Sequence, residues 1–254
     1  MKRVAGLSFA LFALSLTLTP AFAIVIRHDV PDSKYLEFAT SVPSPVILFT
    51  NRLGSADGMG TWITPDWILT AAHVGEMIKV GDSIGIEREL KVEAVTVHAD
   101  WPDMPVDVAL IKVSRATGDA KPVDVCPVTA LEGETVVFVG AGDFGDGKTG
   151  PVSADGKMRA ARNVISSVGE KFVAFIFDSP DSEDAVELEG ISGPGDSGGP
   201  AYLQTKTGFC VLAVSSGQDT EPTGGLEGRY GVIEYYSRVD VLRDWIMEVT
   251  AGSD

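Results

Sequence analysis

Cysteine and histidine are scarce in this sequence, with two cysteines and three histidines among 254 residues. Neither Cys126 nor Cys210 stands in the spacing of a metal site, and the sequence contains no His-Glu-x-x-His segment. We therefore expect no metal ion and no cofactor.

Basic residues are also few. The chain has 20 lysines and arginines against 36 aspartates and glutamates, which gives a formal net charge of −16 at pH 7. Nucleic acids and anionic membranes repel such a chain, so we expect neither as a partner. Acidity of this degree suits a protein that stays soluble outside the cytoplasm.

Long apolar runs are absent except at the start of the chain. Lys2 and Arg3 precede the apolar run Val4–Leu18, and Ala21-Phe22-Ala23 matches the small-x-small pattern of a cleavage site. The run is short for a membrane span, which disfavours the alternative of an uncleaved anchor. Residues 1–23 are predicted to be a signal peptide, and the protein to be secreted or periplasmic.

The remaining residues form short β-rich runs separated by Gly, Pro and Asp, a pattern typical of β-sandwiches and β-barrels. The length suits one large all-β unit or two small barrels. The predicted strands are Val46–Thr50, Gly60–Thr64, Trp67–Thr70, Glu89–Val97, Val108–Val113, Thr135–Gly140, Val173–Phe177, Phe209–Ser215 and Tyr230–Tyr236.

Three other features concern the organisation of the chain. Leu242, Trp245 and Ile246 recur at helical spacing and predict one helix near the C-terminus. The Gly- and Asp-rich segments 143–155 and 218–228 are predicted to be exposed loops. Prolines interrupt the pattern within 121–133, where a domain boundary is expected.

Three segments carry residue types used in nucleophilic catalysis. His73 ends LTAAH, Asp107 enters the apolar run VAL, and Ser197 lies in the turn GPGDSGGP. Each alone has an ordinary explanation, as a structural histidine, a capping aspartate or a loop serine. Together they fit one chemistry, because a serine nucleophile needs an adjacent base and a histidine base needs a carboxylate that fixes its tautomer. The glycines would let backbone N–H groups approach an oxyanion.

The segments LTAAHV, DVAL and GPGDSGGP, in this order, resemble the chymotrypsin/trypsin-like serine proteases. Residues 139–142, 214–217 and 236–239 are similar to further segments of that family, and the likeness covers the chain after residue 23. The resemblance implies an all-β fold of two packed six-stranded antiparallel β-barrels with a C-terminal helix. Residues 24–128 would form the barrel with the histidine and aspartate, and residues 129–254 the barrel with the serine.

The resemblance also implies roles in a secreted endopeptidase that acts through an acyl-enzyme. Ser197 would be the nucleophile, His73 the general base and Asp107 its orienting carboxylate. The N–H groups of Gly195 and Ser197 would form the oxyanion hole. Ser215 is expected to support Asp107, although it could instead be a small residue in a packed strand.

Two other classes of protein share part of this pattern. GDSGG also satisfies the G-x-S-x-G pattern of α/β-hydrolases, but those enzymes need a histidine after the serine. His28, His73 and His98 all precede Ser197. A catalytically silent binding protein on the same fold stays as the alternative, although the catalytic residue types are all present.

The expected substrate pocket departs from trypsin. Ile191 stands where trypsin has the aspartate that recognises Lys or Arg. Glu234 falls near the pocket wall or floor and could attract a basic side chain, unless an insertion places it at the surface. Ser216 and Gly217 are expected along the substrate, with Gly217 leaving the pocket mouth open to large side chains.

Cys126 and Cys210 could be two unpaired buried thiols or one disulfide, which an oxidising compartment would favour. The disulfides that flank the histidine and brace the serine loop in relatives have no cysteines here. Because one cysteine lies near the domain crossover and the other in the second domain, a single bridge between them is predicted.

Ile24 and Val25 follow the predicted cleavage site directly. In relatives, a new N-terminus of this kind inserts into the protein and its ammonium pairs with the aspartate before the nucleophile, here Asp196. One cut after Ala23 would then both export and activate the enzyme, although Ile26 follows where relatives have glycine. The alternative is an apolar overhang left by the signal. Protein or peptide substrates and a monomeric enzyme are expected.

Overall fold

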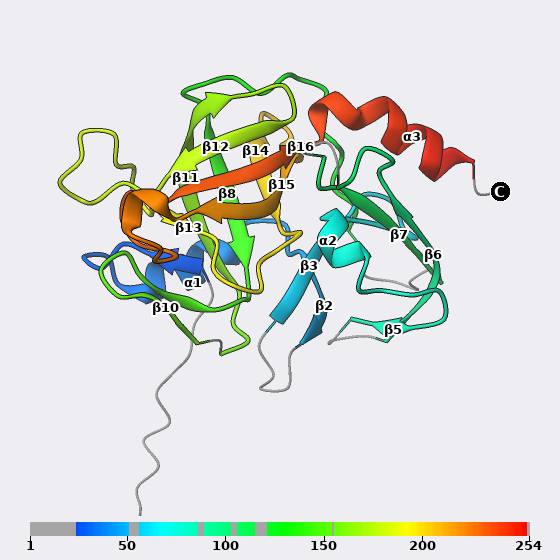
Figure 1. Ribbon diagram of the computed structural model, residues 1–254, viewed down its shortest axis with the longest axis horizontal. Coiled ribbons are helices and arrows are strands. Elements are labelled where there is room, and N and C mark those ends of the chain that lie inside the picture. Colours follow the sequence, from blue (N-terminus) through cyan, green and yellow to red (C-terminus); the bar gives the residue numbers. More distant parts are fainter. Residues whose placement is uncertain are drawn as a thin grey trace, which may run out of the picture.

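The computed structural model describes residues 24–50, 56–85, 89–102, 106–114, 121–153 and 155–252. The predicted signal peptide, residues 1–23, lies outside these ranges. Two β-barrels lie side by side, one containing β3 and β7 and the other β8, β12 and β16 (Figure 1). Within the described ranges, no helix is both long and apolar enough to cross a bilayer.

The first barrel is a six-stranded antiparallel sheet in the order β2-β3-β4-β7-β6-β5. A hydrogen bond of 2.7 Å from Gly85 N to Leu48 O joins the last strand back to the first. The strands are β2 (Val46–Thr50), β3 (Ala56–Trp62), β4 (Trp67–Thr70), β5 (Ser83–Ile84), β6 (Leu90–Val97) and β7 (Ala109–Val113).

The second barrel is closed, in the order β11-β12-β16-β15-β14-β8. Its strands are β8 (Thr135–Gly140), β11 (Arg159–Val168), β12 (Phe172–Ile176), β14 (Pro200–Thr205), β15 (Gly208–Asp219) and β16 (Ile233–Arg238). Phe138 and Phe175 meet edge to face inside it, with ring centroids 4.9 Å apart, and Phe138 stacks on Tyr236. The predicted all-β fold of two six-stranded antiparallel barrels is confirmed.

A short sheet lies beside the second barrel, in the order β10-β9-β1-β13. Its strands are β1 (Ile24–Ile26), β9 (Phe144–Asp146), β10 (Gly150–Ser153) and β13 (Gly190–Ile191). β1 pairs in parallel with β9 and antiparallel with β13, so the first described residues form a central strand of this sheet.

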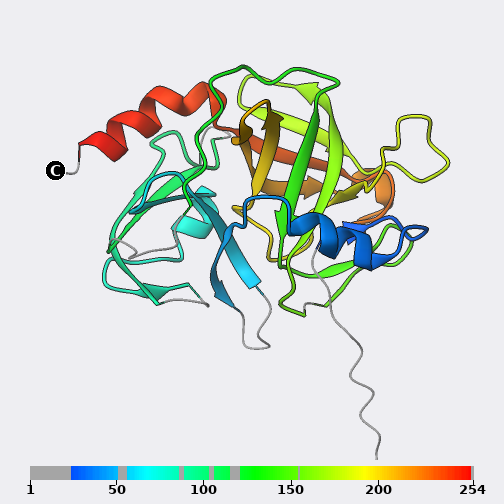
Figure 2. The same ribbon diagram turned by 180° about the vertical axis from the view of Figure 1, so that it is seen from behind.

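The two ends of the described chain pack on opposite barrels. Helix α1 (Asp32–Ala39) lies against the second barrel (Figure 2), where the Tyr35 hydroxyl donates to Glu189 O at 2.9 Å. The predicted C-terminal helix is confirmed as α3 (Arg243–Ala251), and Trp245 contacts His98 of the first barrel, with ring centroids 4.8 Å apart. The predicted unit 24–128 therefore contains the first barrel plus a segment that packs on the second.

Three short helices complete the described elements. They are α2 (Ala72–Gly75), which carries His73, and the 3-10 helices η1 (Glu221–Thr223) and η2 (Asp240–Leu242).

The segment that connects the barrels is attached to the second barrel by a disulfide between Cys126 and Cys210. Cys126 N also donates to Val211 O at 3.0 Å, so both the backbone and the side chain of Cys126 attach the connecting segment to β15. The predicted bridge is confirmed, and the alternative of two free thiols is wrong.

Candidate active site

His73 and Asp107 form a hydrogen-bonded pair at the edge of the first barrel. His73 lies in α2, directly after β4, and Asp107 directly precedes β7, which pairs with β4. The ring Nδ1 of His73 lies 2.7 Å from Asp107 Oδ2, and the backbone N–H of His73 donates to Oδ1 at 2.9 Å. Two contacts to one carboxylate fix the orientation of the imidazole, with its other nitrogen, Nε2, left for a substrate-side partner.

Asp107 is buried, and groups of the second barrel also hold it. Its backbone N–H donates to Ser237 Oγ at 3.1 Å, and Ser216 Oγ donates to its Oδ2 at 2.6 Å. Burial alone would raise the pKa of Asp107, but the hydrogen bonds from His73 and Ser216 and the attraction of His73 outweigh it, and the pKa is lowered. Asp107 is therefore held as an anion.

Ser197 lies in a tight turn between β13 and β14 that needs two glycines in the left-handed region, Gly195 with φ 94° and Gly198 with φ 79°. The Asp196 N–H is used within the turn, donating to Gly193 O at 3.0 Å, and the expected oxyanion donors, Gly195 and Ser197, flank it.

The serine turn packs against the strands that lead to His73. Met59 N donates to Ser197 O at 2.8 Å, and a Cβ at Gly198 would collide with Thr70 and come within 3.0 Å of Ala71 N. From the other side, Gly198 N donates to Ser215 O at 3.0 Å. The serine turn therefore lies against β3 and the end of β4, directly before α2, which carries His73. Helix α2 lies between the two barrels (Figure 1).

The Asp196 carboxylate is buried among backbone amides of other segments. Gly142 N donates to Oδ1 at 2.6 Å and Gly193 N to Oδ2 at 3.0 Å, and the amides of Ala141 and Ile24 also bond to it. A Cβ at Gly140 would collide with this carboxylate, which explains the glycine-flanked strand end. Complete burial nevertheless raises the pKa of Asp196 to about 6.

Ile24 and Val25 are buried, as the predicted insertion requires, with 1% and 0% of their surface exposed. The N–H of Ile24 reaches Asp196, although 172 residues separate them in the sequence. Ile24 also has φ 60°, a strained value for a β-branched residue. A φ angle is defined only while a carbonyl precedes the nitrogen, so an Ile24 with a free amino group would not have this strain.

The strand that lines the expected pocket lies one residue out of the predicted register. The pairing of β15 with β16 shifts between Ser215 and Gly217, so Ser216 is the extra residue of a β-bulge. A bulge re-aims the side chains that follow it. Two predicted roles therefore change.

The two changes concern Ser215 and Ser216. Ser216, not Ser215, supplies the hydroxyl that supports Asp107, and the assignment of that role to Ser215 is wrong. Ser215 Oγ instead lies 3.4 Å from Ser192 Oγ in a buried contact.

The residues after the bulge are those of the expected pocket mouth. Gly217 is exposed, and a Cβ placed on it would meet no atom within 4 Å. Gln218 occupies the position opposite Glu234 in the β15–β16 pairing. That Gly217 leaves the mouth open to large side chains stays a prediction. Sequence reasoning missed Gln218, because the bulge leaves no mark in the residue pattern.

Glu234 and Ile191, the residues expected at the pocket base, are both buried next to Ser192. Glu234 is fully buried, so the alternative that placed it at the surface is wrong. Ser192 N donates to its Oε2 at 3.2 Å, and Ser192 Oγ donates to Oε1. Ile191 is also fully buried, pairs with Val25 across β13 and β1, and belongs to the same apolar cluster as Phe177.

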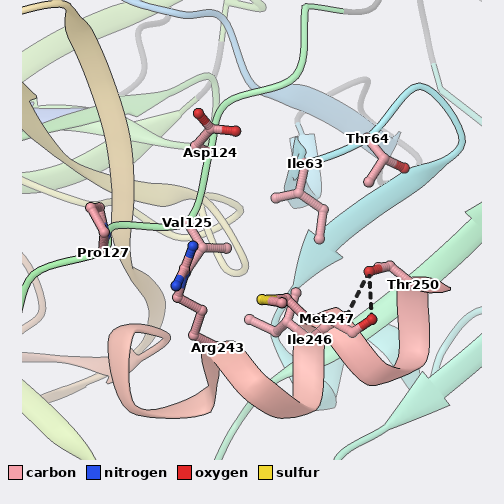
Figure 3. A pocket seen from close by; sticks show the side chains of 9 residues that line it. All are labelled: Ile63, Thr64, Asp124, Val125, Pro127, Arg243, Ile246, Met247 and Thr250. Atoms are coloured by element: carbon pink, nitrogen blue, oxygen red, sulfur yellow. Dashed lines mark hydrogen bonds between the residues drawn. The ribbon is translucent and has the colours of Figure 1, made fainter.

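A separate hollow of about 320 Å³ lies between α3 and the connecting segment. Ile63 reaches into it from one side and Ile246 and Met247 from the helix on the other (Figure 3). None of the candidate site residues lines it. Among the described residues, no three His, Cys, Asp or Glu side chains converge closely enough to hold a metal ion.

We expect Ser216→Ala to lower kcat about tenfold with little change in KM, the effect of losing one hydrogen bond to a charged group. Steady-state kinetics measure both constants, with Ser215→Ala as the matched control. A larger effect of Ser215→Ala on kcat would contradict the observed register.

An Asp–His pair and a glycine-rich serine turn, at the junction of two antiparallel β-barrels, define the class of trypsin-like peptidases. A comparison with family models supports this class directly. The Trypsin family matches residues 41–246, more than half of the chain, and the protein belongs to that family.

Curated relatives are more distant. The chain is 26% identical over 227 residues to an "Uncharacterized peptidase" of Corynebacterium glutamicum strain R, with 87% of this chain and 75% of the relative covered. A protein of strain ATCC 13032 of the same species, also named as a peptidase, matches with the same identity and coverage.

Proposed function

We propose that the protein is an exported, monomeric serine endopeptidase that hydrolyses peptide bonds through an acyl-enzyme on Ser197. The observation that carries the proposal is the 2.7 Å contact between His73 Nδ1 and Asp107 beside the serine turn. Membership of the Trypsin family supports a proteolytic role for this arrangement. No cofactor is needed for the reaction, because the three side chains supply nucleophile, base and orienting charge.

In the proposed reaction, His73 takes the proton of the Ser197 hydroxyl as Oγ attacks the carbonyl carbon of the substrate. The N–H groups of Gly195 and Ser197 stabilise the oxyanion, and loss of one such donor typically costs on the order of 10²–10³ in rate. His73 then protonates the leaving amine, and the acyl group stays on Ser197. Water, activated by the same histidine, releases the acid, while Asp107 remains ionised throughout.

We further propose that cleavage after Ala23 activates the enzyme. The cut would convert the Ile24 amide, which already bonds to Asp196, into an ammonium that neutralises the buried carboxylate. It would also remove the strained φ of 60° at Ile24. Both effects favour the inserted terminus, and the insertion holds the loop that carries Gly195 and Ser197.

The alternative is a binding protein that has the fold without the activity. Hydrolysis of a denatured protein such as reduced casein by the purified protein beginning at Ile24 separates the two. The proposal predicts peptide release that is abolished in Ser197→Ala prepared in the same way. Absence of hydrolysis in the wild type, with the N-terminus verified, would favour the binding protein.

A further inference from the structure

The Gln218 side chain connects two segments of the region expected to hold the substrate. Its Nε2 donates to Ser192 O at 2.8 Å, on the segment before the serine turn, and its Oε1 accepts from Gly228 N at 3.0 Å. Gly228 in turn lies against Val25 of the N-terminal strand. One amide therefore connects three segments that the chain brings together without a nearby disulfide.

Glu234 is the cross-strand neighbour of Gln218. The two residues face each other across β15 and β16, and Gln218 also hydrogen bonds to the Glu234 carboxylate. With Ser192 on its other side, the carboxylate is fully buried and has only internal partners. Burial, together with the charge of Asp196, raises the pKa of Glu234 well above its usual range against the opposing hydrogen bonds.

A long basic side chain of a substrate could reach Glu234 only if Gln218 left both of its hydrogen bonds. The Ser192 carbonyl and the Gly228 N–H would then lose their hydrogen-bond partner. This movement is unfavourable, because a buried polar group without a partner costs free energy. A small side chain, of the size of Ala, Ser or Thr, needs no such movement. Glu234 is thus present in this region, but the Gln218 side chain blocks access to it.

We infer that Gln218 closes the specificity pocket above Glu234, so that the enzyme prefers substrates with a small, uncharged side chain before the scissile bond. This inference rests on the proposed protease function and names the substrate class of its site. Gln218 acts as a specificity-determining residue and Glu234 as a covered acidic base.

Peptide substrates that differ only at that residue, Ala against Lys, test the inference. The wild type should prefer Ala. Gln218→Gly removes the covering amide, and its ratio of kcat/KM for Lys over Ala should rise at least about tenfold. Gln218→Gly combined with Glu234→Gln should lose the gain, which would show that the exposed carboxylate causes it. Gln204→Gly, at an exposed glutamine of β14, is the matched control and should keep the wild-type ratio.

Binding of benzamidine, a small aromatic cation, gives a readout without turnover. On the Ser197→Ala background it should raise the Tm of Gln218→Gly but not that of the otherwise wild-type pocket or of the double variant. If Gln218→Gly does not fold, Gln218→Ala serves in its place. If the wild type hydrolyses the Lys peptide best, the inference about Gln218 is wrong, but the proposed protease function is unaffected. A wild type that hydrolyses neither peptide and does not react with a fluorophosphonate overturns the proposed function.

Discussion

Replacement of His73 with alanine is expected to lower kcat by about 10⁵- to 10⁶-fold, with KM changed little. The serine hydroxyl is a weak nucleophile, and His73 is the base that the structure places against Asp107 at 2.7 Å. Asp107 acts on Ser197 only through the imidazole, so without His73 the remaining two residues contribute almost nothing to kcat. Initial rates on a chromogenic ester and on a peptide measure the loss.

His98→Ala is the matched control for this prediction. The His98 ring packs on Trp245 and accepts a hydrogen bond from Asp100 N at 3.2 Å, so loss of the ring should leave kcat within about twofold. Residual activity of His73→Ala above about one per cent of wild type would mean that another group serves as base, and would contradict the assignment.

A single extra residue before Ile24 is expected to lower kcat/KM on the order of 100- to 1,000-fold, because breaking a buried ion pair leaves Asp196 uncompensated. The extension keeps the amide at Ile24, with its φ of 60°, and prevents the ammonium from forming. Kinetics on protein produced with and without one added alanine measure the effect, and N-terminal sequencing verifies each form. Full activity of the extended protein would contradict the activation proposal.

The pH dependence of stability tests the same pair independently of catalysis. An α-amino group has an unperturbed pKa of about 7.7–8, and pairing with Asp196 raises it in the folded protein. The stabilisation is therefore complete below about pH 7.7 and is lost as pH rises through the raised value. On the Ser197→Ala background, Tm should fall over this range for protein that begins at Ile24. The extended form should lack that fall.

The strands with clear apolar patterns could be predicted from the sequence to the residue, as β2, β4 and β8 show. β11 could not, because its first residue is a fully buried arginine. Arg159 is tolerated there because Asp32, which is 127 residues earlier in the chain, pairs with it at 2.6 and 3.0 Å. Such compensation depends on the fold and leaves no local signal.

β9 and β10 could not be predicted from the sequence, for a related reason. They lie in a Gly- and Asp-rich segment that predicts a loop, and they become strands because β1 arrives from the start of the chain to pair with β9. The residues of the candidate triad were accessible from sequence because each lies in a short distinctive motif. The residues around the pocket were not, since one bulge at Ser216 changes which of four consecutive residues faces Asp107 and which faces Glu234.

The most direct test of the account is covalent labelling of Ser197. The protein that begins at Ile24 is treated with a fluorophosphonate, digested and sequenced by mass spectrometry. We predict one adduct per chain, on the peptide that contains Ser197, and none in His73→Ala or Ser197→Ala. No adduct on a verified wild type, or an adduct on a different residue, would contradict the central claim that Ser197 is the activated nucleophile.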